Sequence, residues 1–147
     1  MKIQECMTRD VRVANPNETI RDAAKMMCEC DAGAVPVGEN DRLIGMITDR
    51  DIAIRAVAEG KNPDTRIREV MSAEVKYCYE DEEVDEVARN MGELQVRRLP
   101  VLSRDKRLVG IIALGDLACS DESEECATQA LAGISRAGGQ HSQSATR

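Results

Sequence analysis

The chain has almost no aromatic residues: its 147 residues include two tyrosines and no phenylalanine or tryptophan. A packed interior must therefore consist mainly of Val, Ile, Leu, Met and Ala, within an apolar content of 42%. Proteins that bind single-stranded nucleic acid stack bases on aromatic side chains, and this chain lacks such a platform. Its formal net charge of −7 also opposes binding to a phosphate backbone. We expect no nucleic-acid partner.

A long apolar segment is also missing. The apolar run over 109–114 is far too short to span a bilayer. The first ten residues, MKIQECMTRD, contain no apolar segment of the kind found in signal peptides. We therefore expect a cytoplasmic protein with no membrane partner.

Metal-binding residues are few, since the chain has one histidine, His141, and six cysteines without zinc-site spacing. Nothing marks the chain as secreted, so we interpret the cysteines as small buried residues and surface thiols. We expect no metal site. A redox sensor at Cys28 and Cys30 is a weaker alternative, because residues two apart on a helix do not face each other.

The sequence repeats itself once. CMTRDVRVANPNETIRDAAKMM, from Cys6, aligns with VMSAEVKYCYEDEEVDEVARNM, from Val70. After one inserted residue, RLIGMITDRDI, from Arg42, aligns with RLVGIIALGDL, from Arg107. The register holds over about fifty residues with a single gap, which indicates a structural duplication.

Each half predicts the order β-α-β-β-α. The predicted strands are 11–14, 34–37, 43–48, 75–78, 98–102 and 108–113. Apolar residues at helical spacing predict two buried helix faces, made of Ile20, Ala23, Ala24 and Met27 and of Val84, Val87, Ala88 and Met91. Thr19 and Asp22 are spaced as an N-terminal capping box, and a further helix over 51–59 is predicted to end at Gly60.

One half alone would bury too little apolar surface to be stable, so we predict two halves packed sheet to sheet around a pseudo-twofold axis. The fold class is α/β of the α+β type. The predicted domains are repeat 1 (3–62), repeat 2 (63–120) and a tail (121–147). In the tail, Ala127, Ala130, Leu131 and Ile134 favour one face of a helix over 124–134, followed by a flexible Gly/Ser/Gln-rich end.

With "MT", "VPV" and "GMITDRDI" in this order, residues 3 to about 120 resemble a tandem pair of cystathionine-β-synthase (CBS) domains, also called a Bateman module, of the stand-alone bacterial type. The resemblance implies a regulatory module that requires no cofactor and forms a homodimer. It also implies an adenosyl ligand, such as AMP, ADP or ATP, in the cleft between the repeats, and a partner protein that responds to it. The chain shows no Gly-rich phosphate loop or nucleophile–histidine pair, so we expect no enzyme.

In this family a Gly-x-x-Thr/Ser-x-x-Asp motif ends a strand, opens a helix and contacts the ribose. The resemblance assigns this role to Thr48 and Asp51, and to Asp116 in the second half. The chemistry is suitable, because a carboxylate accepts hydrogen bonds from ribose hydroxyls. Thr48 and Asp51 also have the spacing of a capping box, and one cap can serve both roles. Ala113 replaces the threonine in the second half, which predicts a weaker second site.

The phosphates of a nucleotide need cations, and Arg97 and Arg98 are the first candidates, followed by Arg9 and Arg50. The first half has the uncharged Gly33 and Ala34 in place of Arg97 and Arg98.

Adenine needs an apolar slot. The candidate walls are Val13, Ala34 and Val35 in one half and Tyr77, Arg98 and Leu99 in the other. Each of these residues could instead be ordinary core or surface. The alternative for the whole chain is a ligand-independent interaction protein that docks a partner through its helices.

Overall fold

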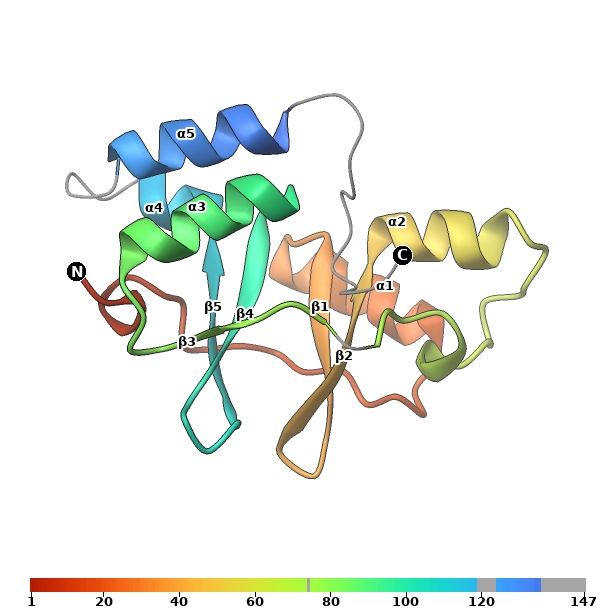
Figure 1. The fold of residues 1–147 in the computed structure, drawn as a ribbon. Helices are drawn as coiled ribbons and strands as arrows, with labels where there is room; N and C mark the ends of the chain where they lie inside the picture. Colours follow the sequence, from red (N-terminus) through yellow and green to blue (C-terminus); the bar gives the residue numbers. More distant parts are fainter. Residues whose placement is uncertain (74, 119–123, 136–147) are drawn as a thin grey trace. The chain divides into compact units, whose positions relative to one another are not determined.

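The computed structural model describes residues 1–73, 75–118 and 124–135 (Figure 1). The chain forms two compact units. The first-repeat unit contains residues 12–75, and the second-repeat unit contains residues 1–11 together with the described residues from 76 onward. Helices and small sheets occur in both units, so the fold is of the predicted α+β class. The repeat boundaries in the sequence remain a prediction.

The first-repeat unit is a hairpin with helices. Its elements are α1 (Ile20–Cys30), β1 (Ala34–Glu39), β2 (Arg42–Thr48), α2 (Asp49–Asp51), η2 (Ile52–Val57) and η3 (Ile67–Glu69). α1 begins with the predicted capping box, in which the Asp22 N–H donates to Thr19 Oγ1 and the Thr19 N–H donates to Asp22 Oδ2, both at 3.1 Å. α2 continues directly into the π-helix η2, which ends at Val57 with Ala58 as its C-cap. Gly60, with a φ of 76°, lies two residues beyond that cap, so the predicted cap position was wrong.

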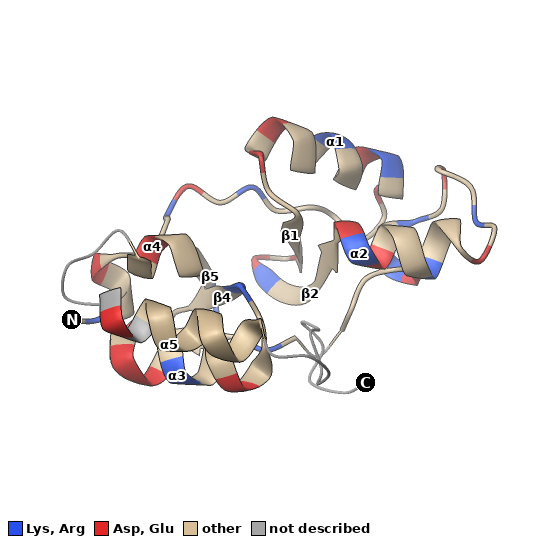
Figure 2. Ribbon diagram, turned by 90° about the horizontal axis from the view of Figure 1, so that it is seen from above, with Lys and Arg blue, Asp and Glu red and all other residues tan. Residues whose placement is uncertain are grey.

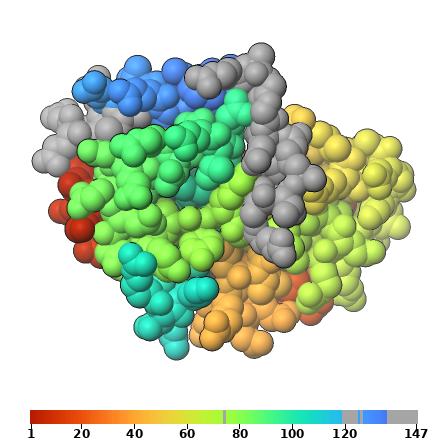
Figure 3. All heavy atoms as spheres, in the orientation of Figure 1, coloured from red at the N-terminus to blue at the C-terminus, as the bar shows by residue number. Residues whose placement is uncertain are grey.

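The second-repeat unit has the corresponding hairpin and two further helices. Its elements are η1 (Ile3–Glu5), β3 (Cys78–Tyr79), α3 (Val84–Leu94), β4 (Arg98–Leu102), β5 (Leu108–Ala113), α4 (Leu114–Ala118) and α5 (Glu124–Ile134). β3 pairs with β4 in parallel, and β4 pairs with β5 antiparallel. α5 lies along α3, and their surfaces touch in the space-filling view (Figure 3).

The first strand of each repeat is shorter than predicted. Over 11–14, only Ala14 pairs with the sheet, through a parallel bridge to Val37. In place of 75–78, the structure has the two-residue strand β3. Arg12 and Val13 are exposed, and no second strand continues the ladder beside them within the described residues. The prediction of a full strand was therefore wrong.

The predicted helix faces need two corrections. Ala24 on α1 is exposed, and Met26 is buried instead. The corresponding residue in the second repeat, Ala88, is buried in the same cluster as Ala127 of α5, whereas the first-repeat unit has no helix in this position among its described residues. Leu131 of α5 is also exposed, because α5 packs through the other residues of its predicted face.

Each unit has its own aliphatic core. The first-repeat core consists of Ala14, Ile20, Ala23, Met26, Met27, Val35, Val37, Ile47, Ala56, Ile67 and Val70. The second-repeat core consists of Ile3, Met7, Cys78, Val84, Val87, Ala88, Met91, Val96, Leu99, Val101, Ile112, Leu117 and Ala127. Neither cluster contains an aromatic residue, in agreement with the composition.

Each hairpin is completed by a segment from the start of the opposite repeat in the sequence. Residues 66–72 complete the first-repeat unit through the bridges Thr19↔Arg66 and Met46↔Ser72. Residues 2–8 complete the second-repeat unit through the bridges Lys2↔Glu83 and Thr8↔Ile111. The four bridges follow the sequence repeat residue by residue, so the duplication extends to the way each sheet edge is closed.

The glycine of each repeated motif makes this closure possible. A Cβ on Gly45 would lie 2.7 Å from the Ser72 carbonyl oxygen, and a Cβ on Gly110 would lie 2.7 Å from the Thr8 carbonyl oxygen. Both distances are below ordinary contact distance, and a backbone oxygen cannot move aside as easily as the side-chain sulfurs of Met71 and Met7, which lie similarly close. Glycine at these positions is therefore required by packing.

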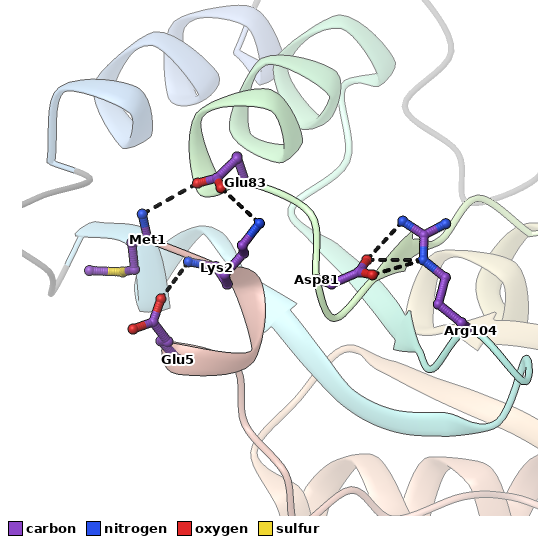
Figure 4. A network of polar contacts seen from close by, with 6 residues as sticks. All are labelled: Met1, Lys2, Glu5, Asp81, Glu83 and Arg104. Carbon is purple, nitrogen blue, oxygen red and sulfur yellow. Dashed lines mark hydrogen bonds and ion pairs between the residues drawn. The ribbon is translucent and has the colours of Figure 1, made fainter.

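Surface ion pairs secure the N-terminal segment on the second-repeat unit (Figure 4). Lys2 Nζ lies 2.9 Å from Glu83 Oε1, and the terminal amine lies 3.4 Å from Glu83 Oε2. Arg104 pairs with Asp81 at 2.8 Å and stacks over the ring of Tyr79, 4.1 Å from its centroid. Exposed pairs of this kind contribute about 0–1 kcal/mol each, so they add little to the stability of the unit.

The packing at Gly110 predicts the effect of a single methyl group. We expect Gly110→Ala to lower the free energy of unfolding by about 1–3 kcal/mol, because the methyl group would force the edge segment away. Gly115→Ala is the matched control: a Cβ there meets nothing within 4 Å. Urea denaturation of both variants measures the effect, and equal stability of the two would contradict the packing role.

Candidate functional site

The end of β2 and the start of α2 hold the first candidate site. The Asp51 N–H donates to Thr48 Oγ1 at 3.0 Å, and the Thr48 N–H donates to Asp51 Oδ2 at 3.0 Å. Thr48 is the N-cap residue, with extended backbone, so its side chain turns back over the first helical turn. The predicted capping box is present, and it holds the hydroxyl and the carboxylate in one orientation.

Asp51 is more enclosed than the exposed Asp49 and Arg50 before it, with a side chain 14% exposed. Burial raises the pKa of the Asp51 carboxyl, while the hydrogen bonds with Thr48 and the charge of Arg55 act in the opposite direction. Oδ1 lies 3.9 Å from Arg55 Nε, beyond hydrogen-bond distance. This oxygen can therefore accept hydrogen bonds from a ligand.

Arg55 was not predicted from the sequence. Its Nη1 donates to the Met71 carbonyl at 3.2 Å and lies 3.4 Å from the Val70 carbonyl oxygen, while its Nε faces Asp51. The guanidinium thus links the helix that begins at the site to the segment closing the sheet edge. The available sequence signal was the spacing of Asp51 and Arg55, four residues apart on a helix.

The second copy retains half of this arrangement. The Ala113 N–H donates to Asp116 Oδ2 at 2.9 Å, as the Thr48 N–H does to Asp51. Ala113 has no hydroxyl, so the reciprocal bond to the Asp116 N–H is missing. The lost hydroxyl thus removes one capping bond, worth about 0.5–1.5 kcal/mol, as well as one contact for a ligand.

The structure brings some of the predicted residues of the first repeat together and separates others. Ala34 is the register partner of Thr48, and the exposed Arg50 lies between Thr48 and Asp51 on the chain. Val35 lies in the core, 2% exposed. Val13 lies near Gly38, toward the turn end of the hairpin, because a Cβ on Gly38 would meet its Cγ1.

Three predicted residues of the second repeat meet at one end of its hairpin. Arg98 is the register partner of Ala113, and the carbonyl of the exposed Arg97 accepts a hydrogen bond from the Leu114 N–H at 2.9 Å. Asp116 belongs to the same helix start as Leu114.

The second-repeat unit holds three further predicted residues, which are Leu99, Tyr77 and Arg9 from the start of the chain. Leu99 is a core residue. Tyr77 is exposed and packs edge-on against Tyr79, with 5.5 Å between ring centroids. Arg9 Nη2 donates to the Gln4 carbonyl at 2.9 Å, next to the bridge at Thr8.

Sequence reasoning also missed Asp49. Its N–H donates to the Gly33 carbonyl at 2.9 Å, and its Oδ2 lies 2.8 Å from the position of a Cβ on Gly33. Figure 2 shows acidic and basic positions alternating at the start of α2, which are Asp49, Arg50 and Asp51. The equivalent residue of the second repeat is Leu114, so only the first repeat has a carboxylate at this position.

The described residues were also compared with the requirements of a metal site and of a membrane-spanning helix. Within residues 1–73, 75–118 and 124–135, no group of three or more His, Cys, Asp and Glu side chains could hold a metal ion. Cys28 and Cys30 are exposed on α1, and Cys78 is buried. None of the helices described is both long and apolar enough to cross a membrane. His141 lies outside the described residues.

The family profile described as "CBS domain" matches the chain twice, over residues 3–57 and 67–120. The chain is 42% identical over 133 residues to the CBS domain-containing protein YhcV of Bacillus subtilis, covering 90% of this chain and 94% of YhcV. Among solved structures it resembles the CBS domain protein TA0289 from Thermoplasma acidophilum, with a TM-score of 0.81, 29% identity, and coverage of 96% of this chain and 80% of the other.

A second structural neighbour has bound ligands. The CBS domain pair of protein MJ0100, in complex with 5′-methylthioadenosine and S-adenosyl-L-methionine, has a TM-score of 0.72 and 30% identity, covering 80% of this chain and 93% of the other.

The pKa values of the two capping carboxylates in the first-repeat unit are shifted in opposite directions, which predicts opposite effects of pH on stability. Burial raises the pKa of Asp51 above its ordinary value of 3.8, whereas backbone and side-chain hydrogen bonds with Thr19 lower the pKa of Asp22. Folded protein therefore binds the Asp51 proton more readily than unfolded protein does, and the Asp22 proton less readily.

The contribution of Asp51 to stability should accordingly grow as the pH falls through its folded pKa toward 3.8. The contribution of Asp22 should be lost as the pH falls through its own folded pKa. On acidification, we expect the free energy of unfolding of the natural chain to rise relative to that of Asp51→Asn. Relative to that of Asp22→Asn, it should fall. Urea denaturation from about pH 7 to about pH 3 tests both, and shifts of the same sign would contradict this electrostatic account.

Proposed function

This chain belongs to the CBS-domain family, and on that premise we propose that it is a regulatory module, not an enzyme, that binds an adenosyl ligand through Thr48 and Asp51. The observation that carries the proposal is the reciprocal Thr48–Asp51 bonding, which presents an enclosed carboxylate oxygen in a fixed direction. The adenosyl ligands bound to MJ0100 support the choice of ligand class.

The chemistry of the motif matches a ribose. The 2′- and 3′-hydroxyls of a ribose are hydrogen-bond donors, and Asp51 Oδ1 is an acceptor outside the capping box. The Thr48 oxygen accepts from the backbone, so its own proton can be donated to a ligand. Ala34, the register partner of Thr48, contributes a small apolar surface beside them. AMP, ADP, ATP and other adenosyl compounds all share this ribose.

The second repeat provides a weaker version of the same site, in which Asp116 acts without a neighbouring hydroxyl. Arg97 and Arg98 lie at that end of the hairpin and supply the cations for a phosphate-bearing ligand. The two repeats are therefore expected to differ in affinity.

A second candidate function is the docking of another protein, favoured by exposed apolar residues on η2. Ile54 is 49% exposed and Val57 is 69% exposed. This helix is continuous with the turn that holds Thr48 and Asp51, so ligand contact and docking share one element. We propose that a second copy of the chain binds this face and forms a homodimer.

The ligand site is tested by substituting each of two capping carboxylates and comparing the effects on ligand binding. We expect Asp51→Ala to weaken the binding of adenosyl ligands by about ten- to a hundredfold, because hydrogen bonds to a charged group contribute about 1.5–3 kcal/mol. Asp22→Ala removes the same kind of capping box from α1 and is the matched control for lost stability. Isothermal titration calorimetry with AMP, ATP and S-adenosylmethionine measures the effect.

Unchanged affinity in Asp51→Ala, or in the double variant Thr48→Ala with Asp51→Ala, would refute this assignment. Binding lost equally in Asp22→Ala would show that the motif acts only through helix stability.

The docking face is tested by measuring the oligomeric state of the chain. We expect Val57→Asp to convert a homodimer into a monomer, because a buried charge opposes the association of apolar faces. Asn40→Asp makes the same charge change at the hairpin turn and should leave the mass unaltered. Size-exclusion chromatography with light scattering reports the mass. A dimer that persists in Val57→Asp would exclude this face from the dimer interface.

A further inference from the structure

We propose that the site of the first repeat selects adenosyl ligands whose 5′ substituent carries no phosphate, and that Asp49 determines this selection. The inference rests on the proposed function, since it assumes that the ribose lies against Thr48 and Asp51. It adds the chemical class of ligand, which the Thr48–Asp51 motif alone does not distinguish.

The position of the Asp49 side chain is well defined by its contacts. The Asp49 N–H donates to the Gly33 carbonyl at 2.9 Å, and Oδ1 accepts from the Arg50 N–H at 2.8 Å. Oδ2 lies 2.8 Å from where a Cβ of Gly33 would be, so the carboxylate occupies the space that a side chain at residue 33 would need. Gly33 directly precedes Ala34, the register partner of Thr48. The carboxylate therefore lies at the same end of the hairpin as the proposed ribose contacts.

No ion pair among the described residues includes Asp49, which is exposed. The adjacent Arg50 contacts its carboxylate through the backbone N–H. Arg55 is held by Asp51 and by the carbonyls of Val70 and Met71. Arg12 pairs with Glu29.

The equivalent pair of residues in the second repeat carries a positive charge, whereas the pair in the first repeat carries a negative one. The hydrogen bond from the Asp49 N–H to the Gly33 carbonyl corresponds to the bond from the Leu114 N–H to the Arg97 carbonyl, and both measure 2.9 Å. One backbone contact thus connects an acidic residue to a glycine in the first repeat, and an apolar residue to an arginine in the second. The backbone is duplicated while the charge at the site is reversed.

The charge reversal matters because the 5′ carbon is attached directly to the ribose ring. A ligand held by its ribose hydroxyls places its 5′ substituent within a few ångströms of the Thr48–Asp51 turn. A 5′-phosphate carries between one and two negative charges at neutral pH, and like charges a few ångströms apart near a protein surface repel strongly enough to change affinity by about tenfold or more. A neutral thioether or a cationic sulfonium at the same position escapes this repulsion.

The test compares AMP with 5′-methylthioadenosine, which share adenine and ribose and differ in the 5′ group. Calorimetric titration is carried out on the full chain carrying Asp116→Ala, which weakens the second site, after thermal unfolding has shown that this chain is folded. We expect 5′-methylthioadenosine to bind at least about tenfold more tightly than AMP. Asp49→Asn in this background should raise the affinity for AMP about tenfold and change that for 5′-methylthioadenosine by less than about twofold.

Asp41→Asn is the matched control. It makes the same charge change in the turn at the opposite end of the same hairpin, where a φ of 63° suits asparagine. We expect it to leave the affinity ratio unaltered. Added salt should narrow the ratio in the parent chain more than in Asp49→Asn, because salt screens exposed charges.

The outcomes separate the two proposals. If both ligands bind but the ratio is near one, or if Asp49→Asn leaves the ratio unchanged, the selection by Asp49 is overturned and the adenosyl site stands. If neither ligand binds to the folded protein or to the natural chain, the proposed function fails and the inference fails with it.

Discussion

The rest of each unit depends on the close backbone approach at Gly45 and Gly110. At these two residues, a short segment from elsewhere in the chain lies against the outer strand of a hairpin so closely that a single methyl group would collide with a carbonyl oxygen. The segments 66–72 and 2–8 close the sheet edges and bring Ile67 and Ile3 into the two cores. Each hairpin is thereby held in a fixed place, and its end positions the functional turn.

The candidate site depends on this arrangement. Thr48 is the last residue of β2, and the helix it caps is connected through Arg55 to the carbonyls of the closing segment. The carboxylate of Asp51 is therefore constrained from two directions, by its cap and by the edge of the sheet. An acceptor held in this way needs little reordering when a ligand binds, which favours affinity. In the second repeat, Ala113 retains the backbone contact and loses the hydroxyl, so the two sites differ although the folds around them correspond.

Much of the fold could be predicted because it follows from local patterns. The hairpins, the apolar faces of Ile20 and Val84 and the caps at Thr19 and Thr48 depend on residues close together in sequence. The errors arose where distant residues decide the outcome. Ala24 and Ala88 occupy equivalent positions, yet only Ala88 is buried in a cluster with α5, and residues 11–14 pair only through Ala14 because no further strand extends the ladder in the described unit. Among the candidate ligand residues, Val35 and Leu99 lie in the cores, a placement that apolar character alone did not distinguish from a binding slot.

By itself, the sequence determined the duplication, the family and the residues of the Thr48–Asp51 turn, because these depend on order and spacing along the chain. Only the tertiary structure decided that Gly45 and Gly110 serve backbone packing, that Arg55 links the site to the sheet edge, and that the Asp49 carboxylate lies against Gly33. These features join residues that lie 15 or more positions apart, and a linear pattern carries no record of such contacts. The physical reason is that close packing and local charge are set by atoms that meet only after the chain has folded.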